Sequence, residues 1–79
     1  MSIYDGLTID NCNFIKEKAL TKKDGVYTIR GIIYRVYDKR VTHYAYWNEI
    51  FLNVGFAITK VGEYTTKDEV KKKLKQLEG

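Results

Sequence analysis

The 79-residue chain contains no proline, one cysteine and one histidine, and Ser2 is its only serine. A single cysteine cannot form an internal disulfide, so the fold has to be held by its core alone. One histidine and one cysteine are also too few for a zinc site of the usual four ligands. The sequence therefore predicts no structural metal and no cofactor.

Groups suited to catalysis are equally scarce. Cysteine nucleophiles need an adjacent base, but no local motif pairs Cys12 with His43, and Ser2 lies at the chain terminus. The acidic residues are scattered, the neighbouring pair Asp68 and Glu69 falls at a helix start, and the six glycines form no phosphate-binding loop. We therefore predict that the protein is not an enzyme.

Length and hydrophobic content set the broad class. With 44% hydrophobic residues and ordinary charge content, residues 1–79 are predicted to form one folded domain. The start Met-Ser-Ile-Tyr-Asp is not typical of a signal peptide, and no apolar run is long enough to cross a membrane. We expect a cytoplasmic protein without a membrane segment.

Residues 8–21 are predicted to form a short helix, with Thr8 or Asp10 as its N-cap. Apolar residues recur there at spacings of three and four, namely Ile9, Cys12, Ile15 and Ala19. The alternative is a strand over 14–21 that pairs with the next strand.

Residues 26–37 are rich in β-branched and aromatic side chains, which is typical of a strand. The apolar alternation changes parity in the middle, because Tyr27 and Ile29 are odd-numbered whereas Ile32 and Tyr34 are even-numbered. We interpret this change as a β-bulge at Gly31, which would restore one apolar face.

Asp38-Lys39 is predicted to be a two-residue turn that leads into a second strand over 40–47. A tight turn would place Val36 opposite Val41, Tyr34 opposite His43, and Ile32 opposite Ala45. Residues 48–55 fit either a strand or a helix, with sheet favoured, and a third strand is expected near 56–64.

The last segment has a capping box in which Thr66 and Glu69 satisfy each other's backbone amides. A narrow apolar stripe follows, formed by Val70, Leu74 and Leu77. The predicted fold is a small α+β domain, with a three-stranded antiparallel sheet, a C-terminal helix and a short N-terminal helix.

The net charge of +4 is concentrated in residues 21–40, which favours an anionic partner. On the predicted register, basic and aromatic side chains share the second face of the sheet, a combination that stacks on bases and neutralises phosphates. The candidate residues are Arg30, Arg35, Tyr37, Arg40, Tyr44 and Tyr46, with a lysine stripe of Lys67, Lys71 and Lys75 on the last helix. The alternative interpretation is an ordinary solvated face, or a face that a helix covers.

We therefore expect a small non-enzymatic binding module that binds nucleic acid through this face. The alternative function is a protein-directed inhibitor or adaptor that acts on a nucleic-acid-handling or defence protein, since exposed Tyr, Trp and Arg are common in protein interfaces. Homodimerisation through a sheet edge or aromatic contacts is a further expectation. The Lys-, Ile- and Tyr-rich composition resembles that of short phage and mobile-element proteins, and the predicted architecture resembles the DNA-binding arms of integrases.

Overall fold

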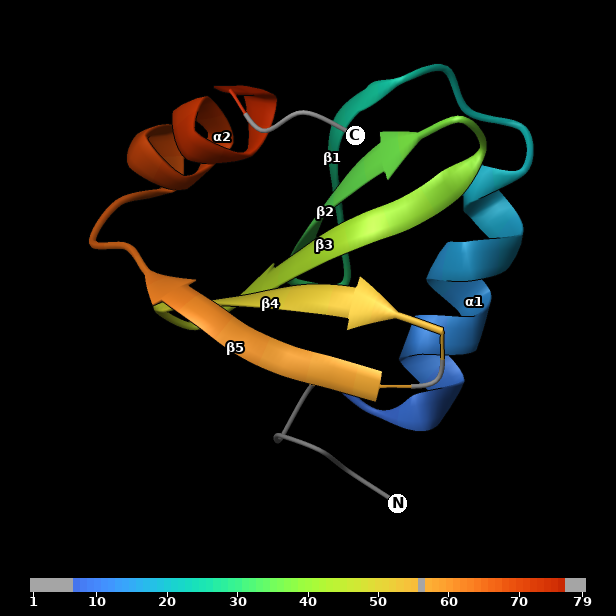
Figure 1. Ribbon diagram of the computed structural model, residues 1–79, viewed down its shortest axis with the longest axis horizontal. Coiled ribbons are helices and arrows are strands. Elements are labelled where there is room, and N and C mark those ends of the chain that lie inside the picture. Colours follow the sequence, from blue (N-terminus) through green and yellow to red (C-terminus); the bar gives the residue numbers. More distant parts are fainter. Residues whose placement is uncertain (1–6, 56, 77–79) are drawn as a thin grey trace.

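The computed structural model describes residues 7–55 and 57–76, which form two helices and five strands (Figure 1). The chain order is α1 (Ile9–Ala19), β1 (Gly25–Ile29), β2 (Ile32–Tyr37), β3 (Arg40–Tyr46), β4 (Glu49–Val54), β5 (Ala57–Glu63) and α2 (Lys67–Gln76). The strands form one antiparallel sheet in the order β1-β2-β3-β4-β5, so each strand pairs with its neighbours in sequence.

Helix α1 begins where the sequence offers a cap. Thr8 is extended, and its hydroxyl accepts a hydrogen bond from the Asn11 amide at 3.1 Å, which satisfies one of the free amides of the first turn. Cys12, Ile15 and Ala19 are buried on one side of the helix, as the spacing predicts. Ile9, the fourth member of that stripe, is 50% exposed.

The residues between β1 and β2 form a tight turn, and the predicted bulge at Gly31 is wrong. Arg30 and Gly31 both have positive φ, at 54° and 77°, and Ile29 pairs with Ile32 across them. Two positive φ values in succession are typical of a two-residue hairpin turn, which reverses the chain. A two-residue hairpin also places odd-numbered residues opposite even-numbered ones, so the parity change has this origin.

The predicted turn at Asp38-Lys39 is confirmed, since both residues have positive φ and Tyr37 pairs with Arg40. The predicted register beyond it is wrong, because β3 carries a bulge that leaves Thr42 as an extra residue. Val36 does pair with Val41, but the next pairs are Arg35 with His43, Tyr34 with Tyr44 and Ile33 with Ala45.

Each face of the sheet packs against one helix, because α1 and α2 lie on opposite sides of it (Figure 1). On the α1 side, Cys12 and Ile15 pack against Tyr34, Tyr44 and Phe51. On the α2 side, a smaller core joins the helix to β2, β3 and β4, through Ile33, Ala45, Ile50, Tyr64, Val70 and Leu74. In the described part of the chain, each side of the five-stranded sheet thus carries a core of its own.

Helix α2 follows the predicted cap in part. The Thr66 hydroxyl accepts from the Glu69 amide at 3.1 Å, but the Glu69 side chain binds the Thr65 hydroxyl and Lys73 instead of reaching back to Thr66. Val70 and Leu74 are buried against the sheet, whereas Leu77 lies outside the described residues.

The predicted α+β class, antiparallel sheet and C-terminal helix are confirmed, and the N-terminal helix is short, but the sheet has five strands and not three. The predicted first strand is a hairpin of two strands. The ambiguous segment 48–55 is largely strand β4. Neither α1, with 11 residues, nor α2, with 10, is long and apolar enough to span a bilayer, and these are the helices of the described part of the chain.

Candidate nucleic-acid interface

The basic and aromatic residues predicted to share a sheet face are not assembled into one surface. Tyr44 is completely buried on the α1 side, where its hydroxyl lies 3.5 Å from the Cys12 carbonyl. Arg35 is only 8% exposed and belongs to the opposite side, because neighbouring strand residues point to opposite faces. The bulge at Thr42 therefore separates the two residues that the predicted face required together.

Two further candidates, Arg30 and Tyr46, lie near the β1–β2 and β3–β4 turns, at the end of the sheet away from the β2–β3 turn. Arg30 is exposed, donates to the Asn11 side-chain carbonyl at 2.8 Å and lies 4.1 Å from the centre of the Phe14 ring. Tyr46 is half-buried against the α1-side core. Arg30 is thus engaged in fastening the first hairpin to α1.

The lysine stripe of α2 divides between the two ends of the molecule. Lys67, Lys71 and Lys75 are all exposed. Lys75 lines a pocket of about 310 Å³ together with Arg35 and Tyr37, whereas Lys67 lines a different pocket with Tyr46. Some of the residues predicted to bind nucleic acid are therefore divided between two pockets, with Lys75 beside Arg35 and Tyr37 in one and Lys67 beside Tyr46 in the other.

Three adjoining pockets surround the end of the β2–β3 hairpin. Lys39 lines two of them, and Asp24 and Tyr37 are shared by two. Their walls carry seven basic and two acidic side chains, and Tyr37, 44% exposed, is the aromatic residue among them. We call this region the basic end, and its basic residues are Lys16, Lys22, Lys23, Arg35, Lys39, Arg40 and Lys75.

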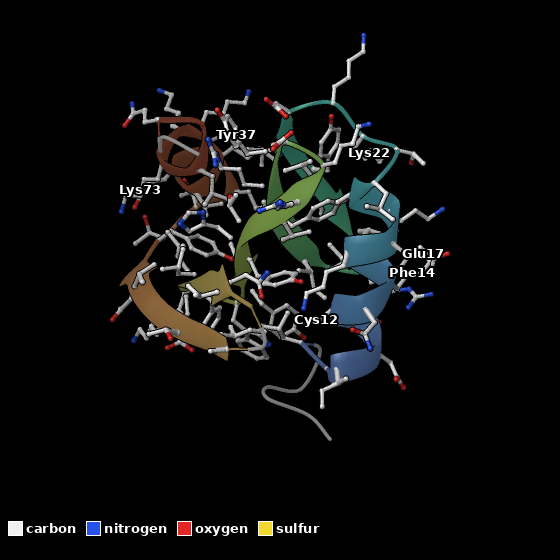
Figure 2. All side chains as sticks on the ribbon, turned by 45° about the vertical axis from the view of Figure 1, so that its right-hand side comes forward. Cys12, Phe14, Glu17, Lys22, Tyr37 and Lys73 are labelled. Carbon is white, nitrogen blue, oxygen red and sulfur yellow. The ribbon has the colours of Figure 1, made fainter. Side chains whose placement is uncertain are left out.

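Figure 2 shows Lys22 and Tyr37 at this same end of the molecule, although they come from the α1–β1 connection and from β2. The connection is held in place by two contacts of its own. The Tyr27 hydroxyl donates to the Lys23 carbonyl at 2.6 Å, and Lys22 lies 4.9 Å from the centre of the Tyr27 ring. The lysines of this segment are therefore presented by a fixed backbone.

The β2–β3 turn is tied to the same connection. The Asp24 carboxylate accepts a hydrogen bond of 2.9 Å from the Asp38 amide, which joins the start of β1 to the turn. This charge-assisted hydrogen bond orders the turn, and the negative charge of Asp24 offsets part of the positive charge of the neighbouring lysines. Lys39 is the second residue of this turn and Arg40 follows it, and both are exposed.

Arg35 forms the innermost part of the basic end. Its Nη1 donates to the Thr42 hydroxyl at 3.0 Å, and its guanidinium lies 5.4 Å from the centre of the Tyr37 ring. His43 Nδ1 lies 3.0 Å from the same hydroxyl. Burial, with a further contribution from the positive charge of Arg35, lowers the pKa of His43 below its ordinary value of 6.5, so His43 is neutral at pH 7.

Two lysines elsewhere on the molecule, Lys60 and Lys73, lie in ion pairs. Lys60 lies 2.9 Å from Glu49 and 3.1 Å from Glu63, and Lys73 lies 3.0 Å from Glu69. The carboxylates of β4, β5 and α2 thus offset nearby lysines. The surplus of positive charge remains at the basic end.

The sequence reasoning identified Arg35, Tyr37, Arg40 and Lys75 of this region, and it missed Lys16, Lys22, Lys23 and Lys39. The signal for most of these residues was the charge excess in residues 21–40, with Lys22-Lys23 and Lys39-Arg40 each beside a turn. In an antiparallel meander these two turns lie at the same end of neighbouring strands, so their lysines come together.

Cys12 and His43 lie on opposite sides of the sheet. Tyr44 directs its hydroxyl toward the Cys12 carbonyl, so the neighbouring His43 points to the other face. Burial raises the pKa of the Cys12 thiol, which keeps it protonated. Within residues 7–55 and 57–76, no three His, Cys, Asp or Glu side chains gather as metal ligands.

The opposite end of the sheet carries the most exposed aromatic side chain of the described residues. Trp47 is 71% exposed in the β3–β4 turn, at a φ of 61°, and contacts Tyr46 edge-on at 6.3 Å between ring centres. A pocket of about 440 Å³ lies beside it, lined partly by Tyr64, Thr65 and Lys67.

Comparison of the chain with protein-family models, with curated proteins and with solved structures finds no match in any of the three.

Proposed function

We propose that the protein is a non-enzymatic binding module that binds nucleic acid through the basic end. The observation that carries this proposal is the excess of seven basic over two acidic side chains around three adjoining pockets. Such a local excess attracts a polyanion, because each cation that meets a phosphate releases a condensed counterion. Tyr37, exposed in the middle of the basic end, supplies a ring on which a base can stack.

The basic end also suits binding because its parts are held before a ligand arrives. The Asp24–Asp38 hydrogen bond joins the α1–β1 connection to the β2–β3 turn, and the Tyr27–Lys23 hydrogen bond joins the same connection to β1. Ordering loops and long side chains costs free energy on association. A backbone that is already held in place removes the part of this cost that comes from the loops. The basic end replaces the sheet face as the proposed interface.

The test is binding of labelled mixed-sequence DNA and RNA at about 50 mM and about 200 mM salt. We expect affinity to fall steeply with salt, and the double variant Lys39→Glu, Arg40→Glu to bind at least ~10-fold more weakly at the lower salt. The double variant Lys67→Glu, Lys71→Glu is the matched control, since it reverses two exposed charges that line none of the three pockets. Absence of binding, or binding that ignores salt, contradicts the proposal.

A second candidate function is a protein-directed inhibitor or adaptor, and exposed Trp47 is the observation that favours it. Tryptophan is enriched among the residues that dominate protein interfaces, and a left-handed turn position holds this one away from the core. If a protein is the ligand, Trp47→Ala will abolish its binding and leave nucleic-acid binding unchanged. Homodimerisation through the sheet edges, which are β1 and β5, stays a prediction.

A further inference from the structure

The largest of the three pockets at the basic end lies where β3 and β4 separate. Their pairing runs from Tyr46–Glu49 to His43–Leu52 and ends there, although β3 begins at Arg40 and β4 continues to Val54. In Figure 1 the β2–β3 and β4–β5 hairpins diverge toward the side where α1 lies. The space between them, which we call the split groove, has a volume of about 650 Å³.

The walls of the split groove are apolar and more exposed than a core. Leu20 at the end of α1 is 61% exposed and Val54 on β4 is 57% exposed, and Val41 and Leu52 line the groove as well. Two apolar side chains left open on facing elements form a slot with affinity for the flat apolar faces of a ligand.

The charge around the split groove has one sign. Lys16, Lys39 and Arg40 line it, and its described lining contains no acidic residue. Asn53 also lines the groove, and its Nδ2 donates to the Val41 carbonyl at 3.0 Å. The groove therefore combines apolar walls with charges of one sign.

We propose that the split groove receives an unstacked base of a single-stranded nucleic acid, with Lys16, Lys39 and Arg40 on the flanking phosphates. This inference rests on the proposed function, and it names the form of nucleic acid that binds. Every base has two apolar faces and a phosphate on each side, which matches the apolar walls and the cations of the groove.

Continuity with the rest of the basic end favours this occupant. Lys39 lines both the split groove and the pocket that contains Tyr37, so a backbone bound along the basic end passes the mouth of the groove. In a duplex the bases are stacked and paired, and a base has to leave the helix before it enters such a slot. Moving a base out of its stack costs less free energy in a single strand than in a duplex, so we expect the single strand to bind more tightly.

The experiment compares a labelled single strand of mixed sequence with the duplex of the same sequence, at one fixed salt concentration. We expect the single strand to bind at least ~10-fold more tightly. The double variant Leu20→Gln, Val54→Gln is expected to remove most of this preference and to leave duplex binding unchanged. Its matched control is Ile9→Gln, Val61→Gln, because these side chains are 50% and 54% exposed and lie outside the groove.

Thermal melting of both double variants checks that each remains folded. Equal affinity for single strand and duplex, or an equal loss in both double variants, overturns the split groove as a base-binding site while nucleic-acid binding at the basic end stands. A lack of binding to either form overturns the proposed function, and this inference with it.

Discussion

The side-chain amide of Asn53 on β4 donates a hydrogen bond of 3.0 Å to the main-chain carbonyl of Val41 on β3, beyond the last paired residues of these two strands. The side chain takes the place of a main-chain donor where the ladder has ended. It thereby limits how far the two hairpins separate, and so sets the width of the split groove.

Asn53→Ala is expected to lower the free energy of unfolding by about 1 kcal/mol, because the Val41 carbonyl loses its donor. The loss is kept small by the simultaneous removal of the unpartnered Oδ1. Urea denaturation measures the change. Asn53→Asp retains the shape but places an acceptor against the carbonyl, so it is expected to be more destabilising than Ala; the reverse order contradicts the assigned hydrogen bond.

Tyr44 provides a direct test of the register. It is fully buried among residues of the α1-side core, so Tyr44→Ala is expected to cost about 3–5 kcal/mol and to unfold much of the population. Tyr44→Phe keeps the ring and loses only a long hydrogen bond to the Cys12 carbonyl, so it is expected to cost about 1 kcal/mol or less. A Tyr44→Ala variant as stable as the parent protein contradicts the burial of this ring.

Features set by neighbouring residues were predictable from the sequence. The Thr8 cap, the buried stripe of Cys12 and Ile15, and the Asp38-Lys39 turn all depend on local hydrogen bonding or local spacing. The parity change around Gly31 was also visible, but a bulge and a two-residue hairpin produce the same alternation. Only pairing with a distant strand distinguishes the two structures.

The side of the sheet on which each residue lies was less predictable. One extra residue at Thr42 transfers Tyr44 to the α1 side and His43 to the other side, because the side chains of a strand alternate with a period of two. The basic end forms because the α1–β1 connection, the β2–β3 turn and the C-terminal ends of α1 and α2 lie close together in the folded protein. The charge excess of residues 21–40 indicated an anionic partner, but the position of the interface required the fold.

His43 predicts a pH dependence of stability. Its pKa is lowered in the folded protein, so below the ordinary value of 6.5 the unfolded chain binds a proton that the folded protein does not. The free energy of unfolding is therefore expected to fall as the pH is lowered through 6.5 and to level off below the folded pKa. Urea denaturation between about pH 7.5 and about pH 5 measures this loss.

His43→Gln is expected to flatten the stability profile over that range. The Glu69 carboxyl has a pKa lowered mainly by the Thr65 hydroxyl and by Lys73, so its contribution disappears only as the pH falls below 4.5 and is separated from that of His43. A profile that is unchanged by His43→Gln shows that another group titrates, and this contradicts the burial of the imidazole beside Arg35.

Lys39 occupies the second position of the β2–β3 turn at a φ of 61°, a conformation that glycine adopts without steric cost. Lys39→Gly is expected to raise the free energy of unfolding by about 0.5 kcal/mol, since relief of the left-handed strain exceeds the added flexibility of the unfolded chain. Lys39→Ala removes the same charge but retains Cβ, so it is the matched control and is expected to show no such gain. Nucleic-acid binding is expected to weaken equally in both variants, since each lacks the Lys39 ammonium at the basic end. Equal stabilisation by alanine would show that charge repulsion, and not backbone strain, governs this turn.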